Sequence, residues 1–245
     1  MNLREFDDKT GLAKAAADEA ARLIREAIAV RGRARIVAAT GSSQIEFLES
    51  LVTVPSIAWG HVELFHLDEY IGLPGDHPAS FQHYIRERIL TRVPVGRAWL
   101  LDGAADPVAE CKRVGEAIAA GPVDGAFAGI GENGHLAFND PPANFDTEEP
   151  FIVVDLAERG RLQQVREGWF ASLEEVPRTA ITMSIRQILK SRAILCLVSG
   201  ARKSEAIKLC LEGGIGPMAP ASALRLHQNA TVFVDREAAA LLQGA

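Results

Sequence analysis

Residues 35–43 read Arg-Ile-Val-Ala-Ala-Thr-Gly-Ser-Ser, an apolar run followed by a loop of small, polar residues. The run is short and bounded by turn residues, which predicts a buried strand over 35–39. A helical pattern follows at about 44–52, so the loop joins the end of a strand to the start of a helix. This order is typical of a sheet with helices packed against it, and we expect it to recur along the chain.

Strand and helix patterns alternate on both sides of this unit. An Ala-rich helix is predicted over 12–31, with Gly32 placed to end it, because glycine tolerates the left-handed backbone found there. Further strands are predicted at 62–67, 123–128, 151–155, 180–183, 193–198 and 230–234. Further helices are predicted at 80–90, 106–120, 184–190, 202–212 and 236–243. The alternation predicts a single α/β domain over 1–245, with a doubly wound, mainly parallel, Rossmann-like sheet and helices on both faces.

Composition and charge exclude several classes of protein. The 245 residues suit one large α/β domain, and no apolar run approaches the ~20 residues needed to cross a bilayer. The first residues lack the basic and apolar segments of a secretory signal, so we expect a cytoplasmic protein that does not bind membranes. The formal net charge is −6 and the basic residues are scattered, which disfavours nucleic-acid binding.

The sequence predicts neither a disulfide nor a metal site. Cys111, Cys196 and Cys210 are an odd, widely spaced set, which we interpret as reduced and at least partly buried thiols. No His or Cys pair has the spacing of a zinc framework, so we expect no metal ion.

Three polar or glycine-rich segments follow predicted strands, at 40–43, 68–70 and 129–135. In doubly wound sheets ligands bind outside the carboxyl ends of the strands, so we expect the three segments to meet at one edge. In the first of them, small residues let backbone N–H groups approach an anion, and a helix N-terminus favours negative charge. The alternative is an ordinary serine-capped helix. Because two other polar segments are expected at the same edge of the sheet, we favour phosphate binding.

The second segment begins with Asp68 and Glu69, directly after an apolar strand. A carboxylate in this position is partly desolvated, which raises its pKa toward the range of a useful general base. For an isolated pair of acids, a helix cap or a solvated turn is the alternative interpretation.

The third segment, residues 129–135, has the sequence Gly-Ile-Gly-Glu-Asn-Gly-His. Its glycines permit a tight backbone, and the His135 imidazole can accept and return a proton on a sugar oxygen. Asp140 lies five residues further on, near enough to orient the imidazole if the loop folds back. A structural histidine is the alternative. The GxGxxG spacing resembles a dinucleotide fingerprint only loosely, because the acid expected after a second strand is absent, and we expect no nicotinamide site.

Longer stretches around these segments resemble the glucosamine-6-phosphate deaminase family. The specific matches are FHLDEYIGL at 65–73, HPASF at 77–81 and GIGENGHLAFNDP at 129–141, with weaker ones at 176–183, 200–203 and 220–224. They occur in the same order over nearly the whole chain. Related lactonases of phosphogluconate share the fold but usually lack the Asp-Glu-Tyr and Gly-His-Leu-Ala-Phe-Asn blocks.

The resemblance implies isomerisation with deamination of an amino-sugar 6-phosphate, above all glucosamine 6-phosphate to fructose 6-phosphate and ammonia, without metal or organic cofactor. It implies that Asp68 moves a proton from C2 to C1. It also implies that His135, positioned by Asn133 and Asp140, assists ring opening. The residues implied to bind the sugar phosphate are Thr40, Gly41, Ser42, Ser43, Glu69, Gly134 and Lys203.

Two positions depart from the family pattern. Asp140 stands where the family usually has the longer Glu, and Gly168 aligns with an Arg that helps to bind the phosphate. Arg161 or Arg166 would have to replace that Arg. A lactone hydrolase, a deaminase or isomerase of another sugar phosphate, and a non-catalytic sugar-phosphate sensor therefore stay open as alternatives.

The resemblance also suggests how the enzyme is regulated. Hexameric, allosteric members have basic residues after the histidine loop and an extended C-terminal tail, whereas this chain has Thr-Glu-Glu-Pro at 147–150 and ends soon after Leu242. We expect a monomer or small homo-oligomer that is not activated by an acetylated amino-sugar phosphate. Sigmoidal kinetics relieved by such a compound would contradict this expectation.

Overall fold

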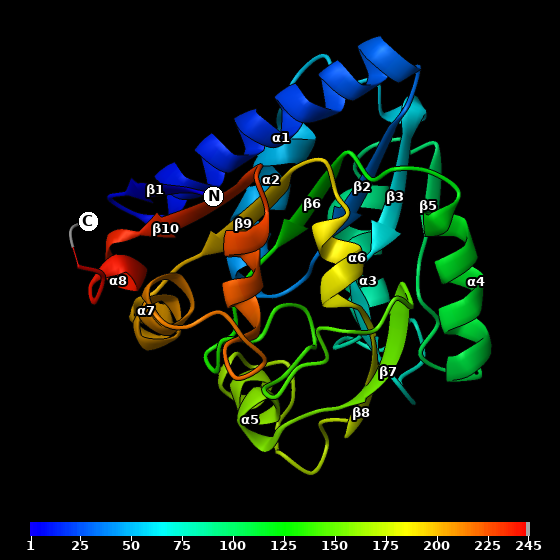
Figure 1. The fold of residues 1–245 in the computed structure, drawn as a ribbon. Helices are drawn as coiled ribbons and strands as arrows, with labels where there is room; N and C mark the ends of the chain where they lie inside the picture. Colours follow the sequence, from blue (N-terminus) through cyan, green and yellow to red (C-terminus); the bar gives the residue numbers. More distant parts are fainter. Residues whose placement is uncertain (244–245) are drawn as a thin grey trace.

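Seven parallel strands form the central sheet of the computed structural model, which describes residues 1–243 (Figure 1). Their spatial order is β1-β10-β9-β6-β2-β3-β5, and each neighbouring pair is parallel. The strands are β1 Asn2–Phe6, β2 Ala34–Ala38, β3 Val62–His66, β5 Arg97–Trp99, β6 Gly125–Ala128, β9 Ile194–Val198 and β10 Ala230–Asp235. The chain runs outward from β2 through β3 to β5 and then returns to β6 on the other side of β2. This is a doubly wound sheet, as predicted, with its switch point between β2 and β6.

The two faces of the sheet are buried by different helices, because side chains alternate along each strand. On β2, Ile36 and Ala38 belong to one apolar cluster, and Val37 belongs to the cluster on the opposite face. The first face is covered by α1 (Lys9–Arg31), α2 (Ile45–Thr53) and α3 (Phe81–Ile85), which continues as a π-helical turn to Leu90. The second is covered by α4 (Pro107–Ala119), α6 (Ile185–Leu189), α7 (Ser204–Glu212) and α8 (Arg236–Ala239).

Helix α1 has the boundaries that its sequence favours. The Asp8 side chain caps the first turn by accepting a hydrogen bond from the Gly11 N–H at 2.7 Å. Gly32 ends the helix in the left-handed region, with φ +73°, which confirms its predicted role. Most of the buried positions of α1 are alanines, so the helix lies close against the sheet and contacts β2, β9 and β10.

A second, smaller sheet was not expected. The strands β4 (Asp68–Tyr70), β8 (Thr179–Met183) and β7 (Phe151–Asp155) pair in an antiparallel sheet. The strands predicted at 151–155 and 180–183 are present but lie in this second sheet, and residues 68–70, for which no strand was predicted, form its third strand. β4 is short and begins with two acids, so its composition gives no strand signal, although all three of its residues are buried.

Other elements also escaped prediction. The structure adds β1, β5, α5 (Glu158–Arg166) and a 3₁₀ segment at Pro220–Leu226. β1 is an edge strand whose residues are largely exposed, and α5 lacks an apolar stripe, since its buried residues are Gln163 and Gln164. The helix predicted over 236–243 ends at Ala239, where the chain turns. Among the helices of residues 1–243, none combines the length and apolar composition that a bilayer crossing needs.

Candidate active site

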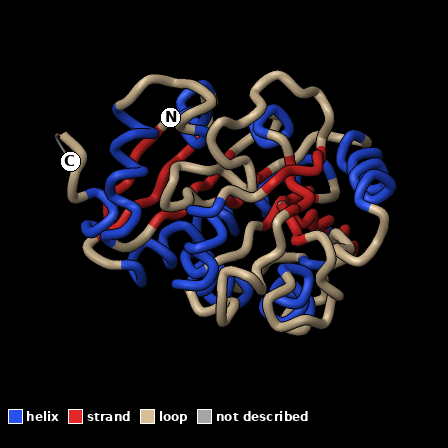
Figure 2. The backbone as a smooth tube through the Cα atoms, turned by 90° about the horizontal axis from the view of Figure 1, so that it is seen from below, coloured by secondary structure: helices blue, strands red, loops and turns tan. Residues whose placement is uncertain are grey.

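A cleft of about 560 Å³, its open mouth included, lies at the carboxyl ends of the central strands. Segments that follow β2, β3, β6 and β9 line it, and residues of α5 close one side. Figure 2 views the molecule from below, where tan loops link the ends of the strands and helices. The three segments predicted to converge, at 40–43, 68–70 and 129–135, each contribute to this one cleft. This is the switch-point location at which doubly wound sheets bind ligands.

Two similar strand-to-helix turns form one end of the cleft. Gly41, with φ +99°, precedes a 3₁₀ turn (Ser42–Gln44) that leads into α2. Gly200, with φ +91°, precedes a 3₁₀ turn (Ala201–Lys203) that leads into α7. The turns lie side by side, because the Ser199 hydroxyl donates to the Ser43 hydroxyl at 3.4 Å. Their small residues and the Lys203 ammonium make this end of the cleft chemically suited to an anion, and we call it the anion-binding end.

Lys203, predicted to bind the phosphate, is 7% exposed and lines the cleft. Burial lowers the pKa of its ammonium, although the nearby carboxylates of Glu167 and Glu132 oppose that shift. A buried ammonium of this kind is stabilised by an anionic ligand.

Asp68 lies where the chain leaves β3 and enters β4, so it is held by both sheets. The preceding residue, Leu67, donates its N–H to Ala38 in the main sheet and accepts from the Met183 N–H in the small one. The Asp68 side chain is 5% exposed and lines the cleft. Burial, followed by the charge of Glu69, raises the pKa of its carboxyl to about 8. Such a carboxylate is a strong base once it is ionised.

Glu69 does not reach the cleft, in contrast to its predicted part in substrate binding. Its side chain is fully buried, and its carboxylate accepts hydrogen bonds from the Ser80 hydroxyl at 2.8 Å and the Gln82 N–H at 2.6 Å. The N–H groups of Phe81 and Tyr70 donate to it as well, at 3.1 and 2.9 Å. Glu69 thus caps the start of α3, which was the alternative interpretation of this acid.

His135 lines the cleft, and a hydrogen-bonded carboxylate orients it. Its Nδ1 lies 3.1 Å from Oδ1 of Asp140, so the shorter side chain does make the predicted contact. Asn133 donates to the same oxygen at 2.7 Å and accepts from the His135 N–H at 3.1 Å. The Ala157 N–H donates to the second carboxylate oxygen at 2.8 Å. Asn133 and Asp140 therefore support the imidazole from outside the cleft, and Nε2 is the ring nitrogen left for a ligand.

Asp140 is ionised at neutral pH. Burial pushes its pKa upward, but the hydrogen bonds and charge of His135, with the hydrogen bonds of Asn133 and Ala157, outweigh burial and leave the pKa below its ordinary value. An ionised partner fixes the proton of the neutral imidazole on Nδ1 and stabilises the imidazolium when a second proton arrives.

The glycines of the histidine loop have packing roles. A Cβ on Gly131 would lie 2.2 Å from ring atoms of His135, so only glycine leaves the imidazole its place. Gly134 has φ +83°, and a Cβ there would approach the Cys210 sulfur at 3.2 Å. Gly134 was predicted to bind substrate; the structure places it outside the cleft lining, against α7.

Neither arginine proposed to replace the one missing at Gly168 lines the cleft. The Arg161 guanidinium donates to the carbonyls of Leu173 and Val176, and Arg166 pairs with Glu132. Gly168 itself has φ +83°, and a Cβ added there would have no neighbour within 4 Å among the described residues.

Four polar residues of the lining were not predicted, namely Gln44, Gln163, Gln164 and Glu167. Gln44 donates from Nε2 to the Ala128 carbonyl at 3.0 Å, while its buried Oε1 has no partner within the described chain. The other three belong to α5 and the residue that follows it, for which no pattern existed in the sequence. Within residues 1–243, no group of three or more His, Cys, Asp or Glu side chains could hold a metal ion.

Comparison with known proteins identifies the family. Residues 7–233 match the model of the glucosamine-6-phosphate isomerases/6-phosphogluconolactonase family. The chain belongs to this family. Among curated members, a glucosamine-6-phosphate deaminase of Bacillus pumilus is 37% identical over 248 residues, covering 98% of this chain and 100% of the relative. One from Latilactobacillus sakei is 40% identical over 205 residues, covering 83% and 85%. The resemblance stated from the sequence is confirmed.

Solved structures of similar fold match nearly the whole chain. A structure described as a monomeric glucosamine-6-phosphate deaminase matches with a TM-score of 0.91 at 35% identity, covering 99% of this chain and 100% of that one. A 6-phosphogluconolactonase of Shewanella baltica matches with a TM-score of 0.78 at 22% identity, covering 96% and 97%. The second match shows that the fold is shared between the two activities of the family.

Proposed function

We propose that this family member converts glucosamine 6-phosphate to fructose 6-phosphate and ammonia. Its support is the set of curated relatives named as deaminases and one geometric observation. That observation is a single cleft in which a buried carboxyl, Asp68, and a carboxylate-oriented imidazole, His135, lie with an anion-binding end. An aldose–ketose conversion needs both groups, one to act at carbon and one to act at oxygen.

Ring opening is the step assigned to His135. Its Nε2 takes the proton of the C1 hydroxyl and returns a proton to the ring oxygen as the C1–O5 bond breaks, which leaves an open-chain aldehyde. Asp140, ionised and 3.1 Å from Nδ1, stabilises the transient imidazolium. Asn133 holds that carboxylate in place from its other side.

Proton transfer between carbons is the step assigned to Asp68. The ionised carboxylate removes the C2 proton while a proton of the substrate's 2-ammonium group passes to the carbonyl oxygen, giving an enolamine. The Asp68 carboxyl then returns its proton at C1, which leaves an iminium group at C2. Water adds to this carbon and ammonia leaves, giving the ketose phosphate. Because burial raises the Asp68 pKa to about 8, the group gains basicity while a useful fraction stays ionised near neutrality.

The anion-binding end would hold the 6-phosphate. Backbone N–H groups of Thr40, Gly41, Ser42 and Ser43 and the ammonium of Lys203 are the donors that support this assignment. Backbone donors at a strand-to-helix turn suit a phosphate dianion, and the Lys203 ammonium adds a compact positive charge.

The decisive experiment measures ammonia and fructose 6-phosphate together, with purified protein, glucosamine 6-phosphate and no added metal. We expect equimolar release of both, and at least ~100-fold slower release by Asp68→Asn, which cannot act as the base. Hydrolysis of 6-phosphogluconolactone is assayed in parallel. Lactonase activity that survives Asp68→Asn, without ammonia release by the wild type, would contradict the proposed reaction.

We also propose a cytoplasmic monomer or small homo-oligomer with hyperbolic kinetics. The support for the monomer is that a solved relative, 35% identical, is described as monomeric. Light scattering of the purified chain measures the state directly, and a hexamer would contradict it.

A further inference from the structure

A carboxylate faces the ammonium of Lys203 at the anion-binding end of the cleft. Oε1 of Glu167 lies 4.0 Å from Nζ of Lys203, and the two side chains are 6% and 9% exposed. Both residues line the cleft. A negative charge at the place where the site meets an anion opposes the binding of that anion, because little water screens the pair.

Lys203 has no other task in the described part of the chain. It is the one Lys or Arg among the lining residues within 1–243, and no hydrogen bond from its Nζ to a protein acceptor forms there. Its donors are therefore available to a ligand. Because Ser199 and Ser43 tie the two turns together, the Lys203 segment borders the Thr40–Ser43 loop, and one anion can contact both.

Glu167 is fixed independently of Lys203. Its carboxylate accepts from Nε2 of Gln163 at 2.7 Å and from Nε1 of Trp169 at 3.3 Å. When a ligand engages the Lys203 ammonium, these two neutral donors still hold the carboxylate in place. The repulsion between Glu167 and a bound phosphate is therefore built into the site and is not removed by a side-chain movement.

A third buried charge near the pair, the Glu132 carboxylate, is 9% exposed and is paired with two arginines. Arg166 and Arg202 both approach Glu132, and their side chains are 41% and 62% exposed. Water and salt screen charges at that exposure, whereas Glu167 and Lys203 are buried. Glu132 does not line the cleft, so the charge that an anion meets at the turns is set mainly by Lys203 and Glu167.

We propose that Glu167 tunes substrate affinity: its carboxylate weakens binding of the phosphate group, so that a phosphate without its sugar binds only weakly. This inference rests on the proposed function, because it concerns the phosphate of that substrate. Substrate and product have the same phosphate, and a tightly bound phosphate would slow product release and admit inorganic phosphate as a competitor. The Glu167 carboxylate lowers phosphate affinity uniformly and leaves discrimination to the sugar contacts.

The test is calorimetric titration with inorganic phosphate of the wild type, Glu167→Gln and a matched control, Glu175→Gln. Glutamine keeps the shape and an acceptor oxygen for Gln163 or Trp169 but removes the charge. Glu175 lies on the same segment, is exposed and does not line the cleft, so its variant controls for net charge. We expect Glu167→Gln to bind phosphate about tenfold more tightly, and Glu175→Gln to match the wild type within about twofold.

A double-mutant cycle with Lys203→Met locates the effect. We expect Lys203→Met to weaken phosphate binding, and the gain from Glu167→Gln to persist when Lys203 is absent, because the Glu167 carboxylate repels the phosphate directly. Equal or weaker binding by Glu167→Gln would overturn the proposal, because Glu167 would then organise Lys203 rather than oppose the ligand. Absence of phosphate binding in every variant would overturn it too.

Two further measurements complete the design. If thermal unfolding shows that Glu167→Gln does not fold, Glu167→Ala removes the same charge and is titrated instead. With active protein, Glu167→Gln should lower KM for glucosamine 6-phosphate about tenfold. Phosphate titration needs no turnover, so a failure of the proposed reaction is recognised separately from a failure of this inference.

Discussion

Asp68 acquires its chemistry from burial, and its ionisation should govern the pH dependence of the reaction. The free enzyme holds the Asp68 pKa at about 8, and only the ionised carboxylate accepts a proton from carbon. The ionised fraction grows with pH, so kcat/KM should rise roughly tenfold per unit between pH 6 and 7 and level off above about pH 8. Initial rates measured over pH 5.5–9 check this, with circular dichroism confirming the fold at each pH. An acid limb centred near pH 4 would contradict it.

The same burial means that ionisation of Asp68 lowers the stability of the folded protein. Its folded pKa, about 8, exceeds the ordinary value of 3.8, so between these values the unfolded chain loses a proton that the folded chain keeps. Stability from this group is complete below about pH 4 and is lost as pH rises through 8. An asparagine side chain does not titrate, and the Asp68→Asn variant should therefore gain stability relative to the wild type by roughly 2–5 kcal/mol between pH 4 and pH 8.5. Urea unfolding at the two pH values measures this difference. A constant difference would show that Asp68 is not protonated in the fold.

Which of two neighbouring acids faces a cleft is beyond the reach of a sequence pattern. Asp68 and Glu69 are adjacent on β4, so their side chains point to opposite sides of the strand. One lines the cleft and the other caps α3, yet both follow the same apolar strand. The pattern placed an acid at the edge of the cleft, and only the pairing of β4 with β8 decides which of the two acids faces it.

At the scale of elements, the capping of α3 by Glu69 should contribute measurably to stability. Glu69→Ala leaves the buried Ser80 hydroxyl and the Phe81 and Gln82 N–H groups without their acceptor, and should cost about 3 kcal/mol or more of unfolding free energy. The matched control is Glu87→Ala, whose side chain is 64% exposed and should change stability by less than about 0.5 kcal/mol. Urea unfolding compares the two variants. Equal losses would refute the cap.

The elements that were predicted are those whose apolar pattern agrees with their burial in the structure. Elements that depend mainly on tertiary contacts were not predicted. β2, β6 and β9 are buried on both sides; β6 and β9 are continuous apolar runs, and β2 is apolar except for Arg35. α5 buries Gln163 and Gln164 in a ligand cleft instead of apolar residues in a core, so it has no helical apolar period. Its site residues, Glu167 included, were therefore missed, whereas Thr40–Ser43 and His135 were recognised from loops with glycines after strands.

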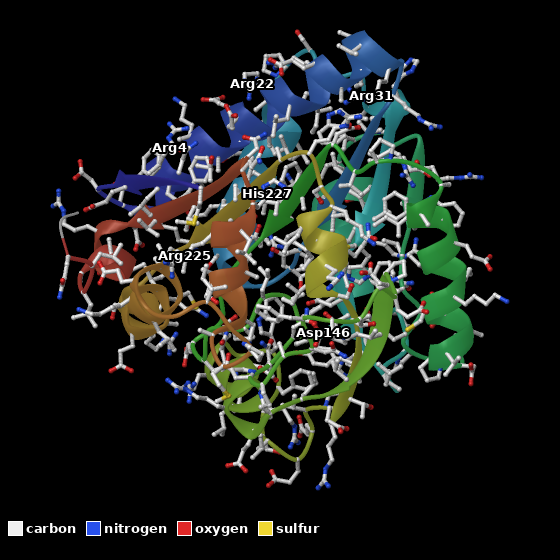
Figure 3. All side chains as sticks on the ribbon, viewed as in Figure 1. Arg4, Arg22, Arg31, Asp146, Arg225 and His227 are labelled. Carbon is white, nitrogen blue, oxygen red and sulfur yellow. The ribbon has the colours of Figure 1, made fainter. Side chains whose placement is uncertain are left out.

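At the scale of the whole molecule, the strands join the apolar clusters into one unit. Alternate residues of β2 and β3 belong to the clusters on opposite faces, so neither cluster persists without the sheet. The small sheet is attached through Leu67, which bonds to both Ala38 and Met183. Figure 3 shows how the side chains fill the molecule from Arg31, at the end of α1, to Asp146 on the side of β7.

We therefore predict one cooperative unfolding transition for the single domain. Scanning calorimetry should give a ratio of van't Hoff to calorimetric enthalpy of about 1. The measurement is made without ligand, because a bound sugar phosphate would stabilise the cleft selectively. Two resolved transitions, with the small sheet and α5 melting first, would contradict the prediction.

The separation of α5 from the other lining segments has a consequence for protein engineering. The groups assigned to proton movement, Asp68 and His135, follow strands of the central sheet, whereas Gln164 and Glu167 lie on one short helix and its next turn. A mutant library confined to those two codons would alter what the α5 side of the cleft accepts and leave Asp68 and His135 unchanged. New substrates can be selected on this scaffold without rebuilding its chemistry.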